Sequence, residues 1–437
     1  MPKELADLRI DARWILPMSA RGAPLGAHSL LVRDGRIAAV LPRAEAERRF
    51  APTVVADRGT HLLLPGLIDS HTHAPLVALA GLLREDPPVA WGGCASADAR
   101  LACAQFAADT LPLAIEAMLR AGVTCFADQY WFADAAARAA VECGMRAVVA
   151  APIAEFATPA GGTLADHLAA ALALHDEYRD HPSVTTAFAP VDLARTTDGA
   201  LARVKTLADE LDTTISLHLH ESAAEIGDSL ARHGLRPIGR LQRLGLLTPS
   251  LHAIHLTHVD ADDLRLAVET GIAATVCASS NLRLGNGLPD AARLAASGLR
   301  LGLGTDGGAA NNDLDLWHEV RLNALSGRHA LDAADGPTLG AAEVLALATR
   351  GSAAALGLAH EIGTLETGKW ADVCCLDVAA SAAPDAAALI EQLVFHGGRD
   401  IVSDVWVAGR HLLAGFRPTR LDGDEARARA RRWTDRL

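Results

Sequence analysis

The stretch PGLIDSHTHAP, residues 65–75, decides how the rest of the chain is interpreted. An apolar run, Leu62–Leu64, meets a Pro-Gly turn, and a second short run then ends in two histidines separated by one residue. Side chains alternate between the two faces of a β-strand, so His71 and His73 point the same way while Thr72 points away. Two imidazoles on one side of a strand end can bind a single metal ion, and imidazole is a good ligand for Zn, Fe, Ni and Cu.

The H-x-H triplet is a weak signal when it is taken alone. With 18 histidines in 437 residues, chance supplies roughly 0.7 such triplets. A second triplet is present at His218–His220. The metal-site interpretation therefore depends on what the other strands carry.

The composition limits the classes of partner. The chain is long enough for one large domain and a small one. A net charge of −13 argues against a nucleic acid or an anionic membrane as partner. No apolar run is long enough to span a bilayer, and the N-terminus lacks the apolar segment of a signal peptide. Seven cysteines without a C-x-x-C pair fit free thiols in a reducing compartment. We expect a cytoplasmic protein.

The pattern of strands and helices predicts the fold class. Residues 1–65 read as short strands, whereas from residue 66 apolar strands alternate with helix-sized intervals, which is typical of parallel βαβ units. Eight such strands in about 290 residues fit an α/β protein with a (β/α)8 TIM-like barrel over residues 66–361. Strand signals return near residue 362, so we expect a small β-sandwich domain made from residues 1–65 and 362–437. The eight expected barrel strands are residues 64–73, 124–132, 145–153, 184–191, 213–221, 251–259, 272–280 and 299–308.

Three of these strands end in side chains that can bind a metal ion. In such barrels the catalytic groups lie at the carboxyl ends of the strands. His71 and His73 end the first strand, His218 the fifth, and Asp306 the eighth. Three nitrogens and one oxygen would hold a divalent ion and leave one position open for water, as a catalytic site requires.

Two more residues at the strand ends complete the expected chemistry. A divalent ion would lower the pKa of its bound water to about 7. Glu221 follows the fifth strand and could move a proton between that water and a ring nitrogen. His255 on the sixth strand could polarise the substrate or orient the water. A two-metal site of this kind would need a bridging lysine at a strand end, and lysine occurs only at positions 3, 205 and 369. We therefore expect one ion, Zn²⁺ in the first place and Fe²⁺ as the alternative.

Five ordered motifs carry a resemblance to a known family. They are PGLIDSHTH, HLHES, AIHLTH, SSNLRLGNG and LGTDGGAANNDLDL. Together they resemble the amidohydrolase superfamily, in particular its cytosine/guanine/triazine-type aminohydrolases and, among these, the methylthioadenosine/S-adenosylhomocysteine deaminases. The resemblance extends to about residue 415. It implies a homodimer. It also implies that His71, His73, His218 and Asp306 are metal ligands, that Glu221 is the acid/base, and that Asp306 accepts the first water proton. His255 matches the histidine of the sixth strand that lies beside the metal ligands.

The expected substrate contacts are less specific than the metal motifs. The deaminases carry a histidine after strand 4, where this chain has Val191, so we expect altered substrate contacts. Trp91 could close over a substrate, and Tyr130 and Trp131 could stack on a flat ring, although aromatic packing is the alternative. Asp98 aligns loosely with a ribose-binding acid of the family, and Asp192 and Arg195 could contact substrate or form an ordinary loop. Asn281 either contacts substrate or fixes its own loop.

The leading hypothesis is a metal-dependent aminohydrolase that releases ammonia from a purine, pterin, pyrimidine or triazine ring. A hydrolase of the same fold that removes chloride, an alkylamine or an amide nitrogen is the first alternative. A catalytically inactive relative is the second alternative.

Overall fold

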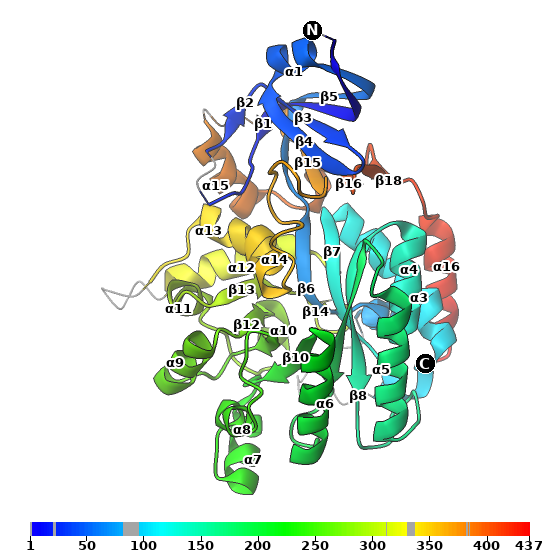
Figure 1. Ribbon diagram of the computed structural model, residues 1–437, viewed down its shortest axis with the longest axis vertical. Helices are drawn as coiled ribbons and strands as arrows, with labels where there is room; N and C mark the ends of the chain where they lie inside the picture. Colours follow the sequence, from blue (N-terminus) through cyan, green and yellow to red (C-terminus); the bar gives the residue numbers. More distant parts are fainter. Residues whose placement is uncertain are drawn as a thin grey trace.

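The molecule consists of a barrel and a smaller sheet above it (Figure 1). The computed structural model describes residues 2–20, 23–81, 96–311, 313–329, 337–381, 383 and 385–437. The blue N-terminal strands and the orange and red strands near the C-terminus lie together in the small sheet. The segment between them forms the barrel and its helices.

The barrel is a parallel sheet that closes on itself. Its strands follow the order β13-β12-β11-β10-β9-β8-β7-β6-β14. Gly304 and Thr305 separate β13 from β14, and β14 pairs back with β6, so eight strand positions form a closed ring. The expected TIM-like barrel is confirmed, with strands in the eight predicted places. The strands are β6 Leu67–His73, β7 Val123–Gln129, β8 Arg146–Ile153, β9 Val184–Pro190, β10 Thr214–Leu219, β11 Leu251–His255, β12 Ala273–Val276, β13 Arg300–Leu303 and β14 Asp306–Gly307.

Helices surround the barrel, and their ends follow local sequence rules. Thr163 and Asp166 form a capping box at the start of α5, and Gly271 ends α9 in the left-handed conformation that glycine adopts without strain. The segment of the barrel contains the 3₁₀ helix η1 Ala74–Leu79, the π-helical turn η3 Leu347–Gly351, and helices α3 Ala104–Arg120, α4 Ala133–Cys143, α5 Leu164–Tyr178, α6 Asp198–Leu211, α7 Ala223–His233, α8 Pro237–Arg243, α9 Ala261–Thr270, α10 Ala278–Arg283, α11 Ala291–Ala296, α12 Leu316–His329, α13 Ala341–Ala346 and α14 Ser352–Ala355.

The small domain is one continuous mixed sheet built from both parts of the chain. Its main path is β18-β17-β16-β15-β5-β1-β3-β4, with β2 paired to β1. The expectation of a small β domain made from both chain ends is confirmed. Its elements are β1 Glu4–Ile15, β2 Leu25–Gly26, β3 His28–Arg33, β4 Arg36–Pro42, α1 Arg43–Arg49, β5 Phe50–Pro65, β15 Val373–Asp377, α15 Ala386–His396, the 3₁₀ helix η4 Arg399–Ile401, β16 Val402–Val407, β17 Arg410–Ala414 and β18 Arg417–Pro418.

The last helix, α16 Gly423–Thr434, lies beside α3 on the barrel side of the molecule (Figure 1). The Trp433 indole and the Arg429 guanidinium donate to Asp109 of α3 at 3.0 and 2.7 Å. The domain boundaries expected from the sequence, residues 1–65 with 362–437 and residues 66–361, stay a prediction.

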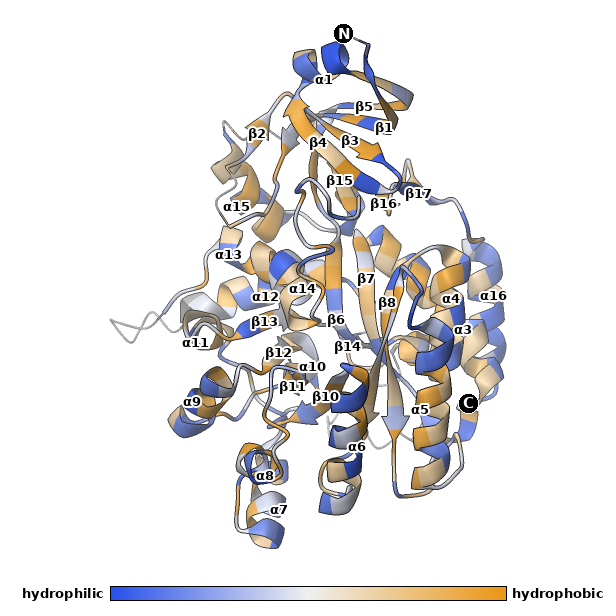
Figure 2. Ribbon diagram, viewed as in Figure 1, coloured by the Kyte–Doolittle hydropathy of each residue, from blue (hydrophilic) through white to orange (hydrophobic). Residues whose placement is uncertain are grey.

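Hydrophobic side chains fill the space between strands and helices. Apolar residues run along β7 and β8, whereas α16 is largely hydrophilic (Figure 2). Ala136, Ala137 and Ala140 of α4 are buried, so an alanine-rich face allows the helix to lie close to the sheet. Of the helices that the structure describes, none combines the length and the apolar character that crossing a lipid bilayer requires.

Candidate active site

Four side chains that could hold a metal ion meet at the carboxyl ends of the barrel strands. Ligand atoms of His71, His73, His218 and Asp306 all lie within 4.8 Å of one another. The Nε2 atoms of His71 and His73 are 3.4 and 3.3 Å from Oδ1 of Asp306. The ring centroids of His71 and His218 are 5.0 Å apart. Residues that are up to 235 positions apart in the sequence thus surround one point, as the strand-end argument predicted.

The backbone at two of these strand ends is in an unusual conformation. His255 has a φ of 82° and Asp306 a φ of 67°, values that are uncommon for residues other than glycine. Such conformations cost about 1–3 kcal/mol each and concentrate at functional sites. Gly304 lets this turn approach the first strand, because a Cβ there would lie 2.9 Å from the backbone of His71.

The imidazoles are oriented by their outer nitrogens. His73 donates its Nδ1–H to the carbonyl oxygen of Gln129, which leaves Nε2 as the lone-pair nitrogen facing the cluster. Nε2 of His71 is buried and has no hydrogen-bond partner among the described residues. Burial lowers the pKa of His71 to about 4 and that of His218 well below its usual value. Both imidazoles are therefore neutral near pH 7, the form that binds metal.

Asp306 is held in the ionised form. Burial by itself would raise the pKa of this carboxyl, but the imidazoles of His71, His73 and His255 bring it well below its usual range. The Ser280 hydroxyl donates to Oδ2, so Oδ1 is the oxygen that faces the imidazoles. An anionic oxygen beside neutral imidazole nitrogens is a donor set that suits a divalent cation.

Glu221 lies next to this cluster between β10 and α7. Its Oε2 is 3.8 Å from Nε2 of His255, and its Oε1 accepts a hydrogen bond of 2.7 Å from the Asn286 amide. The Glu225 carboxylate accepts the backbone N–H groups of His220 and Glu221 at 3.0 and 2.7 Å. The backbone and the side chain of Glu221 are both held by hydrogen bonds.

His255 is oriented from behind by Asn281. Its Nδ1 lies 2.8 Å from Oδ1 of Asn281, whose amide nitrogen donates to the Thr257 hydroxyl. Because Asn281 presents its oxygen, Nδ1 of His255 carries the proton and Nε2 faces Glu221. Asn281 is completely buried and is not among the described residues that line the cavity described next.

A cavity of about 570 Å³ opens beside the cluster. Pockets of this size hold ligands larger than a single heterocycle. Four of the expected substrate residues, Asp98, Tyr130, Trp131 and Asp192, line it together with His73, His218, Glu221, His255 and Asp306. Val191, which the sequence has in place of a histidine after strand 4, also lines the cavity. Trp91 lies outside the described residues.

Two of the acidic groups in this wall are already hydrogen-bonded. Asp98 accepts the Tyr130 hydroxyl at 2.5 Å and the Trp131 indole N–H at 3.2 Å, and burial raises the pKa of Asp98 despite these bonds. Oδ1 of Asp192 accepts the backbone N–H groups of Ala194 and Arg195 at 2.9 and 3.3 Å. Asp98 thus fixes two aromatic side chains, and Asp192 forms a turn.

The other two histidines of the motifs form structural hydrogen bonds. The Nε2 atom of His220 accepts the backbone N–H of Ile238 at 3.1 Å, and its Nδ1–H donates to the carbonyl oxygen of His258. Nε2 of His258 donates to the carbonyl oxygen of Asn286 at 2.6 Å. Both histidines tie the loops around Glu221 together.

Comparison with known proteins identifies the family. Residues 62–412 match the model of the amidohydrolase family. The chain belongs to this family. Two curated 5-methylthioadenosine/S-adenosylhomocysteine deaminases are similar to this amidohydrolase over 99% of its length: that of Teredinibacter turnerae is 36% identical with 98% of its chain covered, and that of Saccharophagus degradans is 35% identical with 97% covered.

Solved structures agree with this assignment. An adenosine deaminase from Xanthomonas campestris with bound zinc has a TM-score of 0.96 and 39% identity, covering 100% of this amidohydrolase and 99% of that chain. Atrazine chlorohydrolase from Arthrobacter aurescens, in complex with zinc, has a TM-score of 0.88 and 24% identity, with 98% and 99% covered. The second likeness extends to the fold alone.

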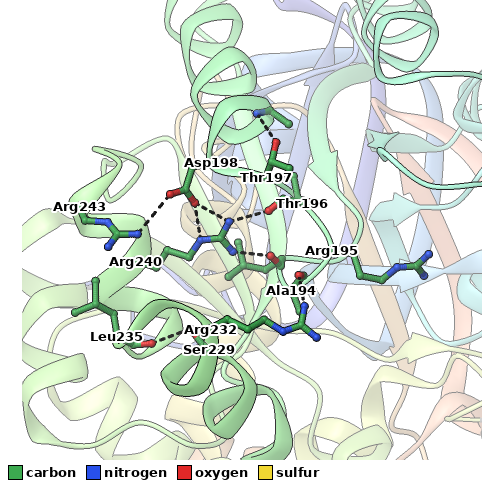
Figure 3. Close-up of polar contacts among 12 residues, drawn as sticks. Ala194, Arg195, Thr196, Thr197, Asp198, Ser229, Arg232, Leu235, Arg240 and Arg243 are labelled. Carbon is green, nitrogen blue, oxygen red and sulfur yellow. Dashed lines mark hydrogen bonds and ion pairs between the residues drawn. The ribbon is translucent and has the colours of Figure 1, made fainter.

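One wall of the cavity in this amidohydrolase is a rigid loop between β9 and α6. The buried Arg240 of α8 donates to the carbonyl oxygens of Leu193 and Thr196 at 2.7 Å each and to Oδ1 of Asp198 at 2.8 Å (Figure 3). Thr197 donates its N–H and its hydroxyl to Glu155 at 2.7 and 3.1 Å. Side chains from two other segments of the chain therefore hold the loop.

Sequence reasoning missed several residues of this site. Asn286 contacts Glu221, Ser280 contacts Asp306, and Arg240 holds the cavity wall. Asn286 lies between two glycines within SSNLRLGNG, which is the only local signal that this side chain has a special position. Arg240 gives no local signal, because nothing in α8 indicates that its guanidinium is buried.

Proposed function

We propose that this amidohydrolase is a hydrolytic deaminase of an adenosine-type nitrogen heterocycle and depends on one divalent metal ion. The observation that carries the proposal is the convergence of three imidazoles and one carboxylate beside Glu221 at the end of a cavity of about 570 Å³. The names of the full-length relatives support the same reaction.

The proposed ligands are His71, His73, His218 and Asp306. The donor set fits a divalent ion, since a buried Nε2 of His71 without a hydrogen-bond partner among the described residues is costly unless something binds it. When bound, the ion lowers the pKa of a coordinated water to about 7. Zn²⁺ is proposed over Fe²⁺ because the similar adenosine deaminase from Xanthomonas campestris contains bound zinc.

Glu221 is the proposed acid/base. With Oε1 held by Asn286, Oε2 remains on the side of His255 and the cluster. From this position it takes a proton from the attacking water and delivers it to the ring nitrogen beside the carbon that loses ammonia. His255, oriented by Asn281, stabilises charge that develops on the reacting carbon's substituents. Asp306 is the proposed acceptor of the first water proton, which leaves with the amino group as ammonia, and the proton that Glu221 moves to the ring nitrogen is the other proton of the same water.

The remaining wall binds the substrate. We assign Tyr130 and Trp131 to contacts with the heterocycle, with Asp98 holding both side chains in place. Tyr130 is buried and hydrogen-bonded, so it presents a fixed surface rather than a mobile one. A substrate that fits this wall is flat and aromatic.

An ammonia-release assay tests the function. The purified full-length protein is analysed for its metal and incubated with adenosines, guanines, pterins, cytosines and triazines. We expect about one divalent ion per chain and stoichiometric ammonia from an adenosine-type compound. Chloride or alkylamine release instead of ammonia would assign a different leaving group, and a metal-free protein without turnover would overturn the proposal. The homodimer and the cytoplasmic location expected from the sequence stay predictions.

A further inference from the structure

Four arginines surround the cavity-wall loop, and one of them differs from the rest. Arg240 binds three acceptors, Arg232 donates to the carbonyl oxygen of Ala194 at 3.0 Å, and Arg243 lies 3.4 Å from Oδ2 of Asp198. The guanidinium of Arg195 has no hydrogen bond or ion pair with a described residue, and its side chain extends away from the other three (Figure 3). Three of the four arginines therefore serve the loop, and the fourth does not.

Arg195 is part of the cavity. It is the only arginine or lysine among the described residues that line it. Its Cζ lies 3.5 Å from the ring centroid of Phe156, which lines the same cavity, so the guanidinium is stacked on an aromatic face. Stacking uses the face of a guanidinium and leaves the N–H groups at its edge available for a ligand.

No acid among the described residues of the lining forms an ion pair or a hydrogen bond with the Arg195 guanidinium. Every carboxylate in the lining already accepts hydrogen bonds from the protein. These pairs are Asp98 with Tyr130 and Trp131, Asp192 with two backbone N–H groups, Glu225 with the His220 and Glu221 N–H groups, Glu221 with Asn286, and Asp306 with Ser280. Arg195, the one permanent cation among the described residues of the lining, is thus also the one charged group there without a hydrogen-bond or ion-pair partner among those residues.

The loop that carries Arg195 does not move freely to meet a ligand. Arg240 and Glu155 both hold it, and the carbonyl oxygen of Ala194, the preceding residue, is bound by Arg232. A side chain on such a support loses little further conformational entropy when it binds a ligand, which favours recognition.

We propose that Arg195 recognises an anionic group, a carboxylate or a phosphate, on the arm of the heterocyclic substrate that lies away from the deaminated ring. This inference rests on the proposed function and specifies its substrate class. A guanidinium presents two parallel N–H donors to a carboxylate or a phosphate, and such charge-assisted pairs are the strong ones. The alternative is that Arg195 only stabilises the loop by stacking on Phe156.

The test compares substrates that share the adenine ring and differ in the charge of the arm. Steady-state kcat/KM is measured with the metal-loaded full chain for 5-methylthioadenosine (neutral), S-adenosylhomocysteine (carboxylate) and adenosine 5′-monophosphate (phosphate). The variant Arg195→Met keeps an apolar stem on Phe156 and removes the charge. Arg203→Met is the matched control, because Arg203 is exposed on α6 and does not line the cavity.

For Arg195→Met we expect kcat/KM to fall about 10- to 100-fold for one of the two anionic compounds, mainly through KM, and to stay within about twofold for the neutral one. The anionic compound whose kcat/KM falls shows whether Arg195 recognises a carboxylate or a phosphate. Arg195→Lys should restore part of the loss, because it keeps the charge without the planar fork. Arg203→Met should leave all three values unchanged.

Equal changes for neutral and anionic compounds, or a lower melting temperature without a change in preference, would overturn the inference. If the wild type deaminates none of the three, the proposed function fails for adenosines, and calorimetric binding of the same compounds still decides the role of Arg195. A loss of affinity confined to an anionic compound in Arg195→Met supports it, and equal affinities for charged and neutral compounds contradict it.

Discussion

Side chains of the kind that bind metals gather at three places among the described residues, and two of these places, one in the barrel and one in the small domain, differ in how those side chains are used. In each region the potential ligand atoms lie within 4.8 Å of one another. The barrel cluster is His71, His73, His218 and Asp306; the cluster in the small domain is His61, Cys375 and Asp404. By residue type and spacing alone, the two are hard to tell apart.

Their hydrogen bonds separate them. In the small domain, Asp404 accepts two bonds from Arg58 at 2.8 and 2.9 Å, one from His411 at 2.9 Å and one from Ser403 at 2.8 Å. In the barrel, the buried Nε2 of His71 has no hydrogen-bond partner among the described residues. Free lone pairs directed at a common point, rather than ligand-type residues in proximity, therefore indicate a metal site.

The largest expected effect comes from breaking the barrel cluster. His71→Asn should lower the metal content from about one ion per chain to near zero. Turnover should fall by at least about 10³-fold, because the bound ion lowers the activation free energy by several kcal/mol. Metal analysis by mass spectrometry and ammonia release measure the two effects.

The matched control is His61→Gln in the small-domain cluster. Because the carboxylate beside His61 is fully engaged by protein groups, this variant should retain the metal content and the turnover of the wild type. A second bound ion that is lost in His61→Gln would contradict the distinction drawn between the two clusters.

Replacement of Glu221 should separate binding from chemistry within the barrel cluster. Glu221→Gln keeps the size and the hydrogen bond to Asn286 but cannot carry the proton, so we expect turnover to fall about 10²- to 10⁴-fold. Metal content and substrate affinity should change little, as measured by metal analysis and by calorimetry. Near-normal ammonia release would remove the acid/base role from this residue.

The sequence predicted the parts of this site that depend on one strand at a time. The eight strands follow from apolar runs, and the positions of His71, His73, His218 and Asp306 at the barrel mouth follow from the rule that parallel strands end at the same rim. Contacts between loops could not be predicted in this way. Asn286 binds Glu221 across 65 positions of the chain, and Asp98 has both oxygens occupied by aromatic residues that come 32 and 33 positions later. Local patterns contain no information about such pairings.

The small-domain cluster should respond through stability rather than activity. Burial by itself would raise the pKa of Asp404, but the hydrogen bonds from His411, Arg58 and Ser403 hold it below its usual value of 3.8. Asp404→Asn should lower the free energy of unfolding at pH 7 by about 2–3 kcal/mol, since it leaves Arg58 without its anion, although that side chain is partly exposed. Urea unfolding measures the change.

The pH dependence of this loss has a defined sign. Because the folded pKa of Asp404 is depressed, its contribution is present above about pH 4 and disappears as the pH falls below the unfolded value. The wild type and Asp404→Asn should therefore converge in stability in acid. Asp57→Asn, at a neighbouring carboxylate that is 73% exposed, is the control and should change little. A constant difference between the wild type and Asp404→Asn at all pH values would mean that packing, and not charge, is responsible.

The smallest expected effect concerns Asn286, whose side chain binds Glu221 beside the barrel cluster. Its amide donates to Oε1 of Glu221 at 2.7 Å and thereby favours one orientation of the carboxylate. Asn286→Ala should lower kcat about 5- to 10-fold, about the value of one hydrogen bond to a charged group, with little change in KM. A general loosening of the loop would instead raise KM, so the division of the effect between kcat and KM distinguishes orientation of Glu221 from simple packing. Asn286→Gln, which keeps the amide donor, should recover part of the rate.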